Sequence, residues 1–479
     1  MPEDFTSHHH WYSATISSLS STNMPSSSDE KPLVVDSYND ALHGFSAVLF
    51  QDELESLKQT TGLISAHSDR KVTLDTTQTY EFLSLSPSHE SESFSDYGFA
   101  TKIPARWKGG CEGGHDLDPS LCNSKLIDAR YFNKGVLAGR PYVNISMASA
   151  RDNIGHGTHT SSLAAGNYVG GVSYFGYAKG IAAHAKLAMY KVTWPEEKFG
   201  SDVLAGLDQA IADGVDVISI SMGFDREMKV RNLGHNGTPW VLNVAASNIG
   251  RTFAGTLTLG NGHSIVGWSL FPANAMVENF PLIYNKTFSA CSSSCSFPRA
   301  RSAIIICDAS KSVNEQIDHV AAAQVYGAVF ISEDPQLYEM GSMTCPGVVI
   351  SPKDAKAVIY YAKTSDLLTA SKEFQQTFVG TELAPTVATY SSRGPSWSYP
   401  GILKPDIMAP GSMILAAWPP NVPAAEIGTN VFLANDYNFL SWTSMACPHA
   451  SGVAALLKMH TQNGFLLLLG LQWSQQPTR

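Results

Sequence analysis

Apolar residues recur along this chain with two different periods, and changes of period mark its parts. Near the N-terminus a strand-like run at Leu33–Tyr38 is followed by a second at His43–Phe50 and then by a helical pattern at Gln51–Gln59. From position 185 onward, continuous apolar runs alternate with segments whose apolar residues return every three or four positions. The pattern therefore predicts a small strand–strand–helix unit followed by a larger α/β domain.

In the larger domain, the alternation of predicted strands and helices is clearest around one helical segment. Ala185–Val192 is apolar throughout, as buried parallel strands are. We expect Ser201 to cap a helix that ends at Gly214, and Val215–Met222 to return as a second strand. Trp240–Ala246 is a further strand candidate. Short links of this kind predict parallel strands with right-handed helical crossovers.

The pattern of apolar and polar residues changes again between about residue 270 and residue 378. Short apolar strands alternate there with helices, at 303–307, 313–326, 328–331, 347–350 and 353–363. Such a set can bury a core of its own, which predicts a small α/β module inserted in the larger domain. The predicted division of the chain is 1–75, 76–269, 270–378 and 379–479.

Composition narrows the class of protein. The chain has 479 residues, 44% of them hydrophobic and 15% charged, which is typical of a folded protein of two to four domains. Its formal net charge of -10 argues against nucleic acid or an anionic membrane surface as the main partner. No run of 18 apolar residues predicts a transmembrane helix, and Phe465–Leu469 is far too short. Residues 1–20 lack a basic stretch followed by an apolar one, so no signal peptide is visible.

Cysteines and possible glycosylation sites point in the opposite direction, toward export. Cys111 and Cys122 flank a loop rich in Gly, Asp and Pro that a disulfide would close. The triplets that begin at Asn144, Asn236 and Asn285 permit N-glycosylation if the chain is secreted.

The stretch Ser441–Lys458, S-W-T-S-M-A-C-P-H-A-S-G-V-A-A-L-L-K, carries the first chemical signal. Ser444 stands where a turn opens into a helix whose first turns are crowded with small residues. The N–H groups and dipole at a helix N-terminus favour negative charge, which suits a serine nucleophile beside a developing oxyanion. An N-cap serine on a buried helix is the other interpretation, and this stretch alone leaves both open.

The second signal is A-R-D-N-I-G-H-G-T-H-T at residues 150–160. His156 lies between two glycines, where an imidazole can stand at a cleft and act as base for a serine hydroxyl. The competing interpretation is a metal site formed by Asp152, His156 and His159, although H-x-x-H lacks the spacing of common zinc sites. His8–His10 is interpreted as a solvated helix start in preference to a metal site or a tag.

Together, G-H-G-T-H-T and T-S-M-A-C-P-H resemble motifs of the subtilisin-like serine proteases of the plant type, and the resemblance spans roughly residues 5 to 459. It implies a mainly parallel sheet flanked by helices and hydrolysis of protein or peptide substrates through an acyl-enzyme, without a cofactor or metal. It also implies His156 as general base and Ser444 as nucleophile. The segment with Ser221, Met222 and Gly223 resembles the edge that takes a substrate peptide as an added strand.

The resemblance extends to the parts outside the catalytic domain. S-H-H-H-W-Y and H-G-F-S-A-V-L resemble an α+β inhibitory prodomain, which implies an intramolecular inhibitor with a cleavage point near Asp75 and Thr76. The inserted module resembles a protease-associated domain. The family also implies an extracellular location.

Several family segments have no counterpart here. The strand and D-T-G-I-W-P-E-S segment that bear the catalytic Asp are missing between residues 82 and 98, and neither Asp75 nor Asp96 replaces them. The S-A-G-N segment that supplies the oxyanion Asn is missing after Gly223, and Trp442 stands where the family has a glycine. We also expect the prodomain to be incomplete at its start and the catalytic domain to be truncated at its end.

These departures predict a chain that is inactive or nearly so. Losing the carboxylate behind a catalytic histidine costs about 10⁴ in rate in a well-studied serine protease, and losing one oxyanion donor costs roughly 10²–10³. The alternative function is a catalytically dead homologue that binds peptides or proteases. An incomplete or mis-spliced gene product is a third interpretation.

Overall fold

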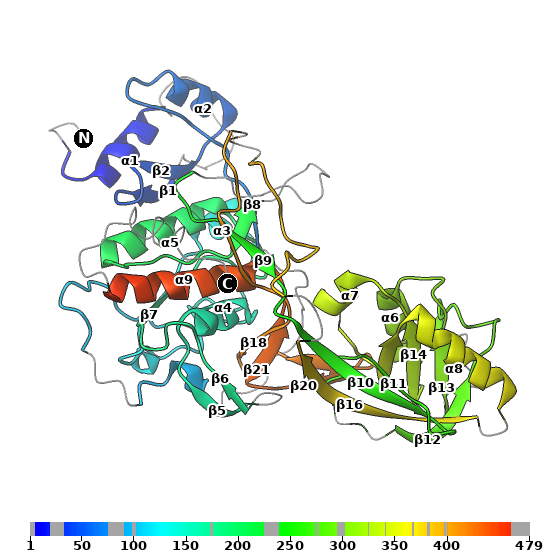
Figure 1. The fold of residues 1–479 in the computed structure, drawn as a ribbon. Helices are drawn as coiled ribbons and strands as arrows, with labels where there is room; N and C mark the ends of the chain where they lie inside the picture. The colour runs from blue at the N-terminus through cyan, green and yellow to red at the C-terminus, as the bar shows by residue number, and fades with distance from the viewer. Residues whose placement is uncertain are drawn as a thin grey trace.

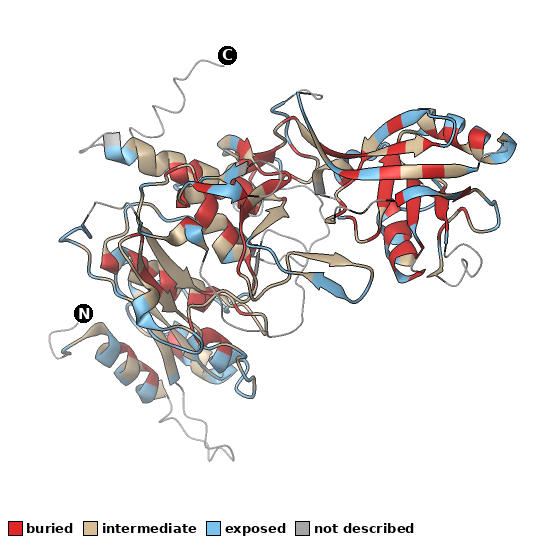
Figure 2. Cartoon of the chain, turned by 90° about the horizontal axis from the view of Figure 1, so that it is seen from below, coloured by how far each residue is buried: buried red, intermediate tan, exposed pale blue. Residues whose placement is uncertain are grey.

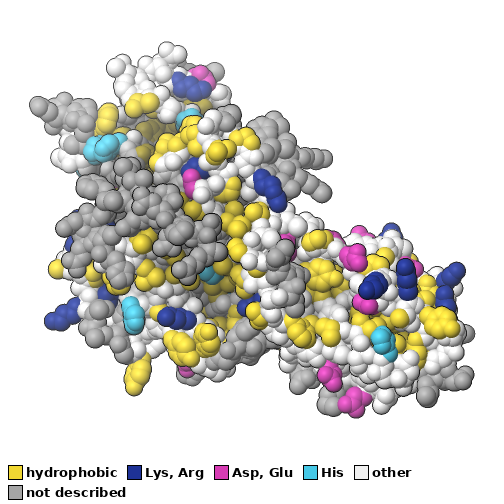
Figure 3. Space-filling model, in the orientation of Figure 1, with side chains coloured by type: hydrophobic (Ala, Val, Ile, Leu, Met, Phe, Trp, Pro, Cys, Tyr) yellow, Lys and Arg dark blue, Asp and Glu magenta, His cyan; other side chains and the backbone are white. Residues whose placement is uncertain are grey.

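The computed structural model describes residues 5–19, 33–74, 91–97, 102–172, 176–224, 239–273, 275, 277–294, 302–323, 325–340, 342–365, 368–380, 384–396, 399 and 401–460. Figure 1 shows a larger body, with the N-terminal unit at one side of it, and a barrel lobe that extends from the other side. Within these ranges, no helix combines the length and the apolarity needed to cross a membrane. On the face drawn in Figure 3, Lys and Arg side chains are scattered among other residues.

The N-terminal unit forms as the sequence predicts. Its elements are α1 (His8–Leu19), β1 (Leu33–Tyr38), β2 (Gly44–Val48), α2 (Gln51–Lys58) and, after a loop, β3 (Val72–Leu74). β1 and β2 pair antiparallel, and α1 packs on them through buried Tyr12 and Ile16. The Tyr12 ring lies 4.8 Å from that of Phe45 between centroids, which fixes the helix on the strand pair.

The larger body contains parallel strand pairs with helices beside them. Its elements are η1 (Glu92–Phe94), η2 (Pro119–Leu121), β4 (Leu126–Tyr131), α3 (Lys134–Gly139), α4 (His156–Ala165), β5 (Val169–Val172), β6 (Gly176–Ala178), β7 (Leu187–Lys191), α5 (Gly200–Asp213), β8 (Met222–Phe224), β9 (Val244–Ser247), β17 (Ile407–Pro410), β18 (Ile414–Ala417), β19 (Ala425–Ile427), β20 (Val431–Leu433), β21 (Tyr437–Leu440) and α9 (Thr443–His460). β4 pairs parallel with β7, and β9 pairs parallel with β17. α4 packs against α9, so the two helices that begin near the candidate catalytic residues lie side by side.

Two local predictions in this body are wrong. Val215–Met222 is not a strand, because only Met222–Phe224 pairs with a neighbour. A strand needs partners for its backbone groups, and in the described part of the chain residues 217–221 have no strand beside them. Ser201 is not a cap, because α5 begins at Gly200 after Phe199. The predicted end of α5 is confirmed, because Gly214 follows the last helical residue and has φ +93°.

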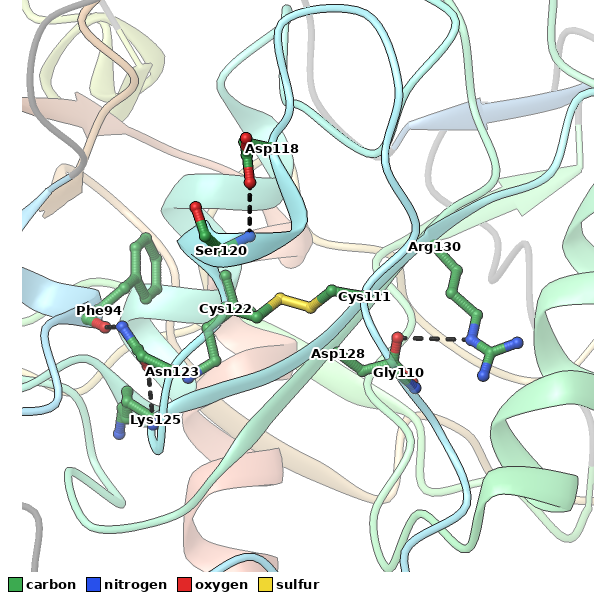
Figure 4. The surroundings of a disulfide bond; sticks show 11 residues. Phe94, Gly110, Cys111, Asp118, Ser120, Cys122, Asn123, Lys125, Asp128 and Arg130 are labelled. Carbon is green, nitrogen blue, oxygen red and sulfur yellow. Dashed lines mark hydrogen bonds and ion pairs between the residues drawn. A yellow bond between two sulfur atoms is a disulfide. The ribbon is translucent and has the colours of Figure 1, made fainter.

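A disulfide shapes the loop that leads into β4. Cys111 and Cys122 are joined, which confirms the predicted closure (Figure 4). The Asn123 amide next to the bridge donates to the Phe94 carbonyl at 3.0 Å, while its side-chain oxygen accepts from the Lys125 N–H at 2.8 Å. The bridge and these bonds hold the η1 turn against the start of β4.

The barrel lobe corresponds to the predicted inserted module. Its elements are β10 (Arg251–Leu259), β11 (Ser264–Trp268), β12 (Val277–Ile283), β13 (Ile304–Cys307), α6 (Val313–Ala323), β14 (Gly327–Ile331), α7 (Pro335–Met340), β15 (Gly347–Ile350), α8 (Pro352–Thr364) and β16 (Thr369–Val379). The strands close in the order β10-β11-β15-β14-β13-β12-β16 around the largest buried core of the described chain (Figure 2). β10 and β11 precede residue 270, so the barrel begins near Arg251. A second disulfide, Cys291–Cys307, lies in this lobe and was not predicted.

Candidate active site

Ser444 stands in the first turn of α9 and is fully buried. Its Oγ donates to the Ser221 carbonyl oxygen at 3.3 Å, and Ser221 Oγ donates to the Ser444 carbonyl oxygen at 3.0 Å. The Ser444 carbonyl is available because the helical partner four residues on is Pro448, which has no N–H. The two serines are therefore bonded to each other across the start of the helix.

Trp442 shapes the turn that precedes the nucleophile candidate. Its φ is +121°, a conformation that side chains with a Cβ rarely adopt. Its N–H donates to the Gly411 carbonyl at 2.8 Å, and its indole packs on Tyr390 with ring centroids 4.8 Å apart. The preceding Ser441 donates to the Glu339 carbonyl of α7 at 2.6 Å. The turn is thus held by both the larger body and the barrel lobe.

His156 is the first residue of α4, and the loop before it is tightly built. The Asp152 carboxylate accepts hydrogen bonds from the N–H groups of Ile154, Gly155 and Thr158 and from the Thr158 hydroxyl, at 2.7–3.0 Å. Gly155 has φ +92°, and a Cβ there would meet the Trp418 ring at 2.3 Å. A glycine is therefore required immediately before His156.

The imidazole of His156 lies against a cavity without a hydrogen-bond partner. Its Nε2 is buried and unbonded, and the side chain lines a cavity of about 1020 Å³. Burial lowers the pKa of His156 to about 4, although the nearby Asp152 charge opposes the shift. His156 is therefore neutral at pH 7, as a general base must be, but within the described ranges no carboxylate is bonded to its ring.

The structure brings the helices of His156 and Ser444 together without bonding the two side chains. α4 and α9 are in contact, yet among the described residues no hydrogen bond joins His156 to Ser444. Asp96, one of the two carboxylates considered as a replacement for the missing Asp, accepts from the Ser124 N–H at 3.1 Å. Asp75 lies outside the described residues.

The candidate substrate edge is occupied by another part of the same chain. β3 pairs antiparallel with β8, with Thr73 opposite Gly223 and Leu74 opposite Met222. On the other side of β3, the Val72 N–H donates to the Lys198 carbonyl at 3.2 Å. The segment 70–74 thus lies as a strand between two segments of the larger body.

Side chains anchor this segment, which we call the tail (residues 69–74). Lys71 forms a 2.6 Å ion pair with Glu197, which also pairs with Arg140 at 3.0 Å. Burial raises the pKa of Glu197, but its bonds to Lys71 and Arg140 outweigh that effect and hold the pKa below its usual value. Asp69 accepts from the Ser201 N–H at 3.1 Å, so Ser201 binds the tail rather than capping α5.

A second anchor lies nearer the N-terminus and was missed in the sequence. The Asp208 carboxylate on α5 accepts hydrogen bonds from the consecutive N–H groups of residues 39–41, at 2.6–3.1 Å. A carboxylate on a helix gives no sequence signal of such a role, because its partners are backbone groups far away in the chain.

Comparison with known proteins identifies the family. The subtilase family model matches residues 138–475, and the peptidase inhibitor I9 model matches residues 1–75. The subtilisin-like protease SBT3 of Solanum lycopersicum is 47% identical in an alignment 519 positions long, which covers 96% of this chain and 68% of that protein. This chain belongs to the subtilase family.

Other relatives agree with that assignment. Subtilisin-like protease SBT1.9 of Arabidopsis thaliana is 36% identical over 95% of this chain and 69% of its own length. Among solved structures, a psychrophilic subtilisin-like protease, Apa1 of Pseudoalteromonas sp. AS-11, matches with 14% identity and a TM-score of 0.31. That match covers 66% of this chain and 76% of that one, but so low a TM-score adds nothing to the assignment. The subtilase is therefore a serine-type endopeptidase by family, and its mainly parallel α/β class is the predicted one.

Within the residues that the structure describes, no group of His, Cys, Asp or Glu is arranged to hold a metal ion, the set Asp152, His156 and His159 included. His159 is buried, and its Nε2 contacts the carbonyl oxygens of Ile414 at 3.0 Å and Asn438 at 3.1 Å. The Asp152 carboxylate is taken up by its own loop. His159 and Asp152 therefore act as structural groups on either side of His156.

Two of the three possible glycosylation sites lie in the described part of the chain. Asn144 and Asn285 are exposed, as a glycan requires. The Asn285 side-chain oxygen accepts from the Thr287 N–H at 2.9 Å, which forms a local turn. Asn236 lies outside the described residues.

Proposed function

We propose that this subtilase is a peptide-bond hydrolase by descent that keeps a peptide-binding edge and has a strongly weakened acyl-transfer step. His156 would act as general base and Ser444 as nucleophile, while Ser221, Met222 and Gly223 hold the substrate backbone. No cofactor or metal takes part in this scheme.

One observation carries the proposal: the tail lies as an added strand on β8. An extended segment that pairs with a strand edge is bound mainly through its backbone, so the same edge would accept peptides of varied sequence. The tail ends beside the predicted cleavage point near Asp75 and Thr76, which lie outside the described residues. We infer that the N-terminal unit is an intramolecular inhibitor that holds its own tail in the substrate position.

The weakness of the chemistry follows from the site's bonds. Ser444 donates to a backbone carbonyl, which cannot take its proton, and in the part of the chain that the structure describes no carboxylate bonds to His156 to orient it. A general base must be within about 3.2 Å of the hydroxyl that it activates. Loss of the orienting carboxylate alone predicts a turnover about 10⁴ below that of an intact relative.

We further propose the roles of the other parts. Residues 1–75 would be the inhibitor, 76–269 and 379–479 the two parts of the catalytic domain, and 270–378 a protease-associated module. The two disulfides support an oxidising, extracellular location, where Asn144, Asn236 and Asn285 would be open to glycosylation.

The test is hydrolysis of unfolded casein by the intact chain, by its Ser444→Ala and His156→Ala variants, and by the tomato relative. We expect turnover about 10⁴-fold below that of the relative, and we expect either substitution to abolish the turnover that remains. Turnover within tenfold of the relative contradicts the weakened step. Hydrolysis that survives Ser444→Ala contradicts the assigned nucleophile.

A binding function is the second candidate, favoured by the intact edge beside weakened chemistry. It predicts that casein peptides bind without being cleaved, and that binding rises when the tail is displaced. Cleavage at the rate of the tomato relative rejects it.

A further inference from the structure

The hairpin formed by β5 and β6 carries two exposed tyrosines whose rings are in contact. Tyr168 stands directly before β5, and Tyr177 lies in β6; Figure 1 shows this strand pair in the larger body. The ring centroids are 5.5 Å apart and the ring planes differ by 18°, which is a stacked arrangement. Among the tyrosines that the structure describes, no other two have their rings in contact.

The register of the strands places both rings on the same face of the hairpin. Gly170 pairs with Tyr177, so the position opposite Tyr168 lies two residues beyond Tyr177 in the chain. Residues in this diagonal relation share a face of an antiparallel pair and are within reach of aromatic side chains. The stacking of the two rings therefore follows from the strand pairing itself.

This face is open to solvent, while the other face of the hairpin is buried. Tyr168 is 64% exposed and Tyr177 is 56% exposed. Val169 and Val172, by contrast, are buried. A Cβ added at Gly170, opposite Tyr177, would meet nothing within 4 Å, so the rings have open space beside them. Small reagents in solution can therefore reach both phenols, and the rings can tilt toward each other.

The hydroxyls of this pair have no role in the fold. Cross-strand aromatic pairs stabilise hairpins through contact of their rings, and that role does not require phenols. In the described part of the chain, no hydrogen bond uses the hydroxyl of Tyr168 or of Tyr177. The hairpin thus presents two unbonded phenols whose rings touch, which is an arrangement with a chemistry of its own.

Neighbouring phenols can be joined by oxidation. Loss of one electron and the phenolic proton converts each tyrosine to a phenoxyl radical, whose unpaired electron is shared with the Cε carbons beside the oxygen. Two such radicals form a bond between one Cε of each ring, and the hydrogen on each of these carbons moves to the phenoxyl oxygen. The two electrons and two protons removed reduce one hydrogen peroxide to two waters at a haem peroxidase. Because both phenols lie on one hairpin, their coupling is intramolecular, and at low protein concentration no separate molecule competes with it.

We propose that Tyr168 and Tyr177 form a modification site, at which hydrogen peroxide and a haem peroxidase join the two phenols as dityrosine within one chain. The link closes the hairpin covalently, beside a base that is held because the Asn167 N–H donates to the Ser93 carbonyl at 2.9 Å. Such chemistry belongs to an oxidising location, which the two disulfides favour. The inference goes beyond the proposed function, because it uses no step at Ser444.

The test treats the full chain, in the Ser444→Ala background, with hydrogen peroxide and a haem peroxidase at several submicromolar protein concentrations. Dityrosine is measured by its fluorescence and located by tandem mass spectrometry of a digest. We expect a single link between Tyr168 and Tyr177, with a yield per chain that is independent of protein concentration. Tyr168→Phe and Tyr177→Phe each keep the ring and lose the phenol, and each should lower the yield roughly tenfold or more. Tyr142→Phe, at a tyrosine that is 99% exposed but stacks on no other described tyrosine, should leave the yield unchanged.

Three results overturn the proposal. The first is a dityrosine yield that survives Tyr168→Phe or Tyr177→Phe. The second is a yield that rises in proportion to protein concentration together with covalent dimers, which means that tyrosines of separate molecules couple. The third is absence of dityrosine from the chain while N-acetyltyrosine is coupled in a parallel reaction. Because Ser444 is absent from this background, failure of the proposed enzyme function leaves these outcomes unaffected.

Discussion

Ser444 and Ser221 exchange hydrogen bonds, each hydroxyl donating to the other residue's carbonyl oxygen, at 3.3 and 3.0 Å. This pair joins the start of α9 to the segment that carries the substrate edge. The exchange depends on Pro448, because an ordinary residue at that position would donate its N–H to the Ser444 carbonyl. The nucleophile candidate is therefore held in place by the edge that it would serve, and among the described residues its hydroxyl is not bonded to His156.

Trp442 gives a prediction about backbone strain. At φ +121° any Cβ is strained, whereas glycine is free of that cost. We expect Trp442→Gly to be more stable to urea than Trp442→Ala by about 1 kcal/mol, the reverse of the usual order of Gly and Ala. Both variants lose the contact with Tyr390, so the comparison isolates the backbone term. A Trp442→Gly protein that is the less stable of the two would contradict the strain.

The tail gives a prediction about strand docking. Val72→Pro removes the N–H that donates to the Lys198 carbonyl, and so loosens a neighbouring bond, from the Gly200 N–H to the Arg70 carbonyl at 2.9 Å. Loss of one such bond, about 0.5–1.5 kcal/mol, predicts roughly 2- to 12-fold faster hydrogen exchange at Gly200. Val72→Ile keeps the N–H and serves as control. Unchanged exchange at Gly200 in Val72→Pro would mean that docking of the tail does not depend on its backbone hydrogen bonds with residues 198–200.

The same tail should loosen in acid. The pKa of Glu197 is depressed in the folded chain, so its stabilising contribution is present above the unfolded pKa and is lost as pH falls through the lower folded value. We expect the protection factor of the Gly200 N–H, which compares its exchange rate with the intrinsic rate at the same pH, to fall as the pH is taken from 6 to below about 4.3, the ordinary pKa of a glutamate. In Glu197→Gln that dependence should be absent, and an unaltered pH profile in this variant would contradict the role of the ion pair.

Lys372 gives a prediction about the barrel lobe. Its Nζ is buried and donates to the carbonyls of Ala328 and Pro346, at 2.6 and 3.1 Å. Burial lowers its pKa to about 7, so between pH 7 and 8.5 the unfolded chain binds more protons and stability should rise with pH. The rise is at most about 1.4 kcal/mol per pH unit and should vanish in Lys372→Met but persist in Lys353→Met, an exposed control. Calorimetry of the lobe's transition at the two pH values measures it; a rise that survives Lys372→Met would contradict the shift.

The local pattern of the sequence correctly predicted strands that have neighbouring strands to pair with. β13, β14 and β15 are parallel strands that bury every residue, and each was visible as an apolar run. The Val215–Met222 prediction failed for a physical reason: composition can favour a strand, but only neighbouring strands satisfy its backbone. Two motifs selected His156 and Ser444, and of these only Ser444 was predicted to stand at the start of a helix. The structure adds that His156 begins α4 and that α4 contacts α9.

Other parts of the site depend on contacts that no short motif encodes. The bond between Ser444 and Ser221 joins positions 223 residues apart. Asp208 holds N–H groups of residues 39–41, whose identity is irrelevant to the contact. Trp442 was predicted to disturb a glycine position, and its φ of +121° agrees with that reasoning.

The central claim is that Ser444 is in the nucleophile's place and is not activated. A fluorophosphonate probe tests it, applied to the intact chain, to Ser444→Ala and to the tomato relative. Because the tail could block the probe, Val72→Pro is labelled as well. We predict labelling of the intact chain and of Val72→Pro at least 10³-fold slower than labelling of the relative, since no carboxylate of the described residues bonds to His156. Labelling at the relative's rate that disappears in Ser444→Ala would contradict the account.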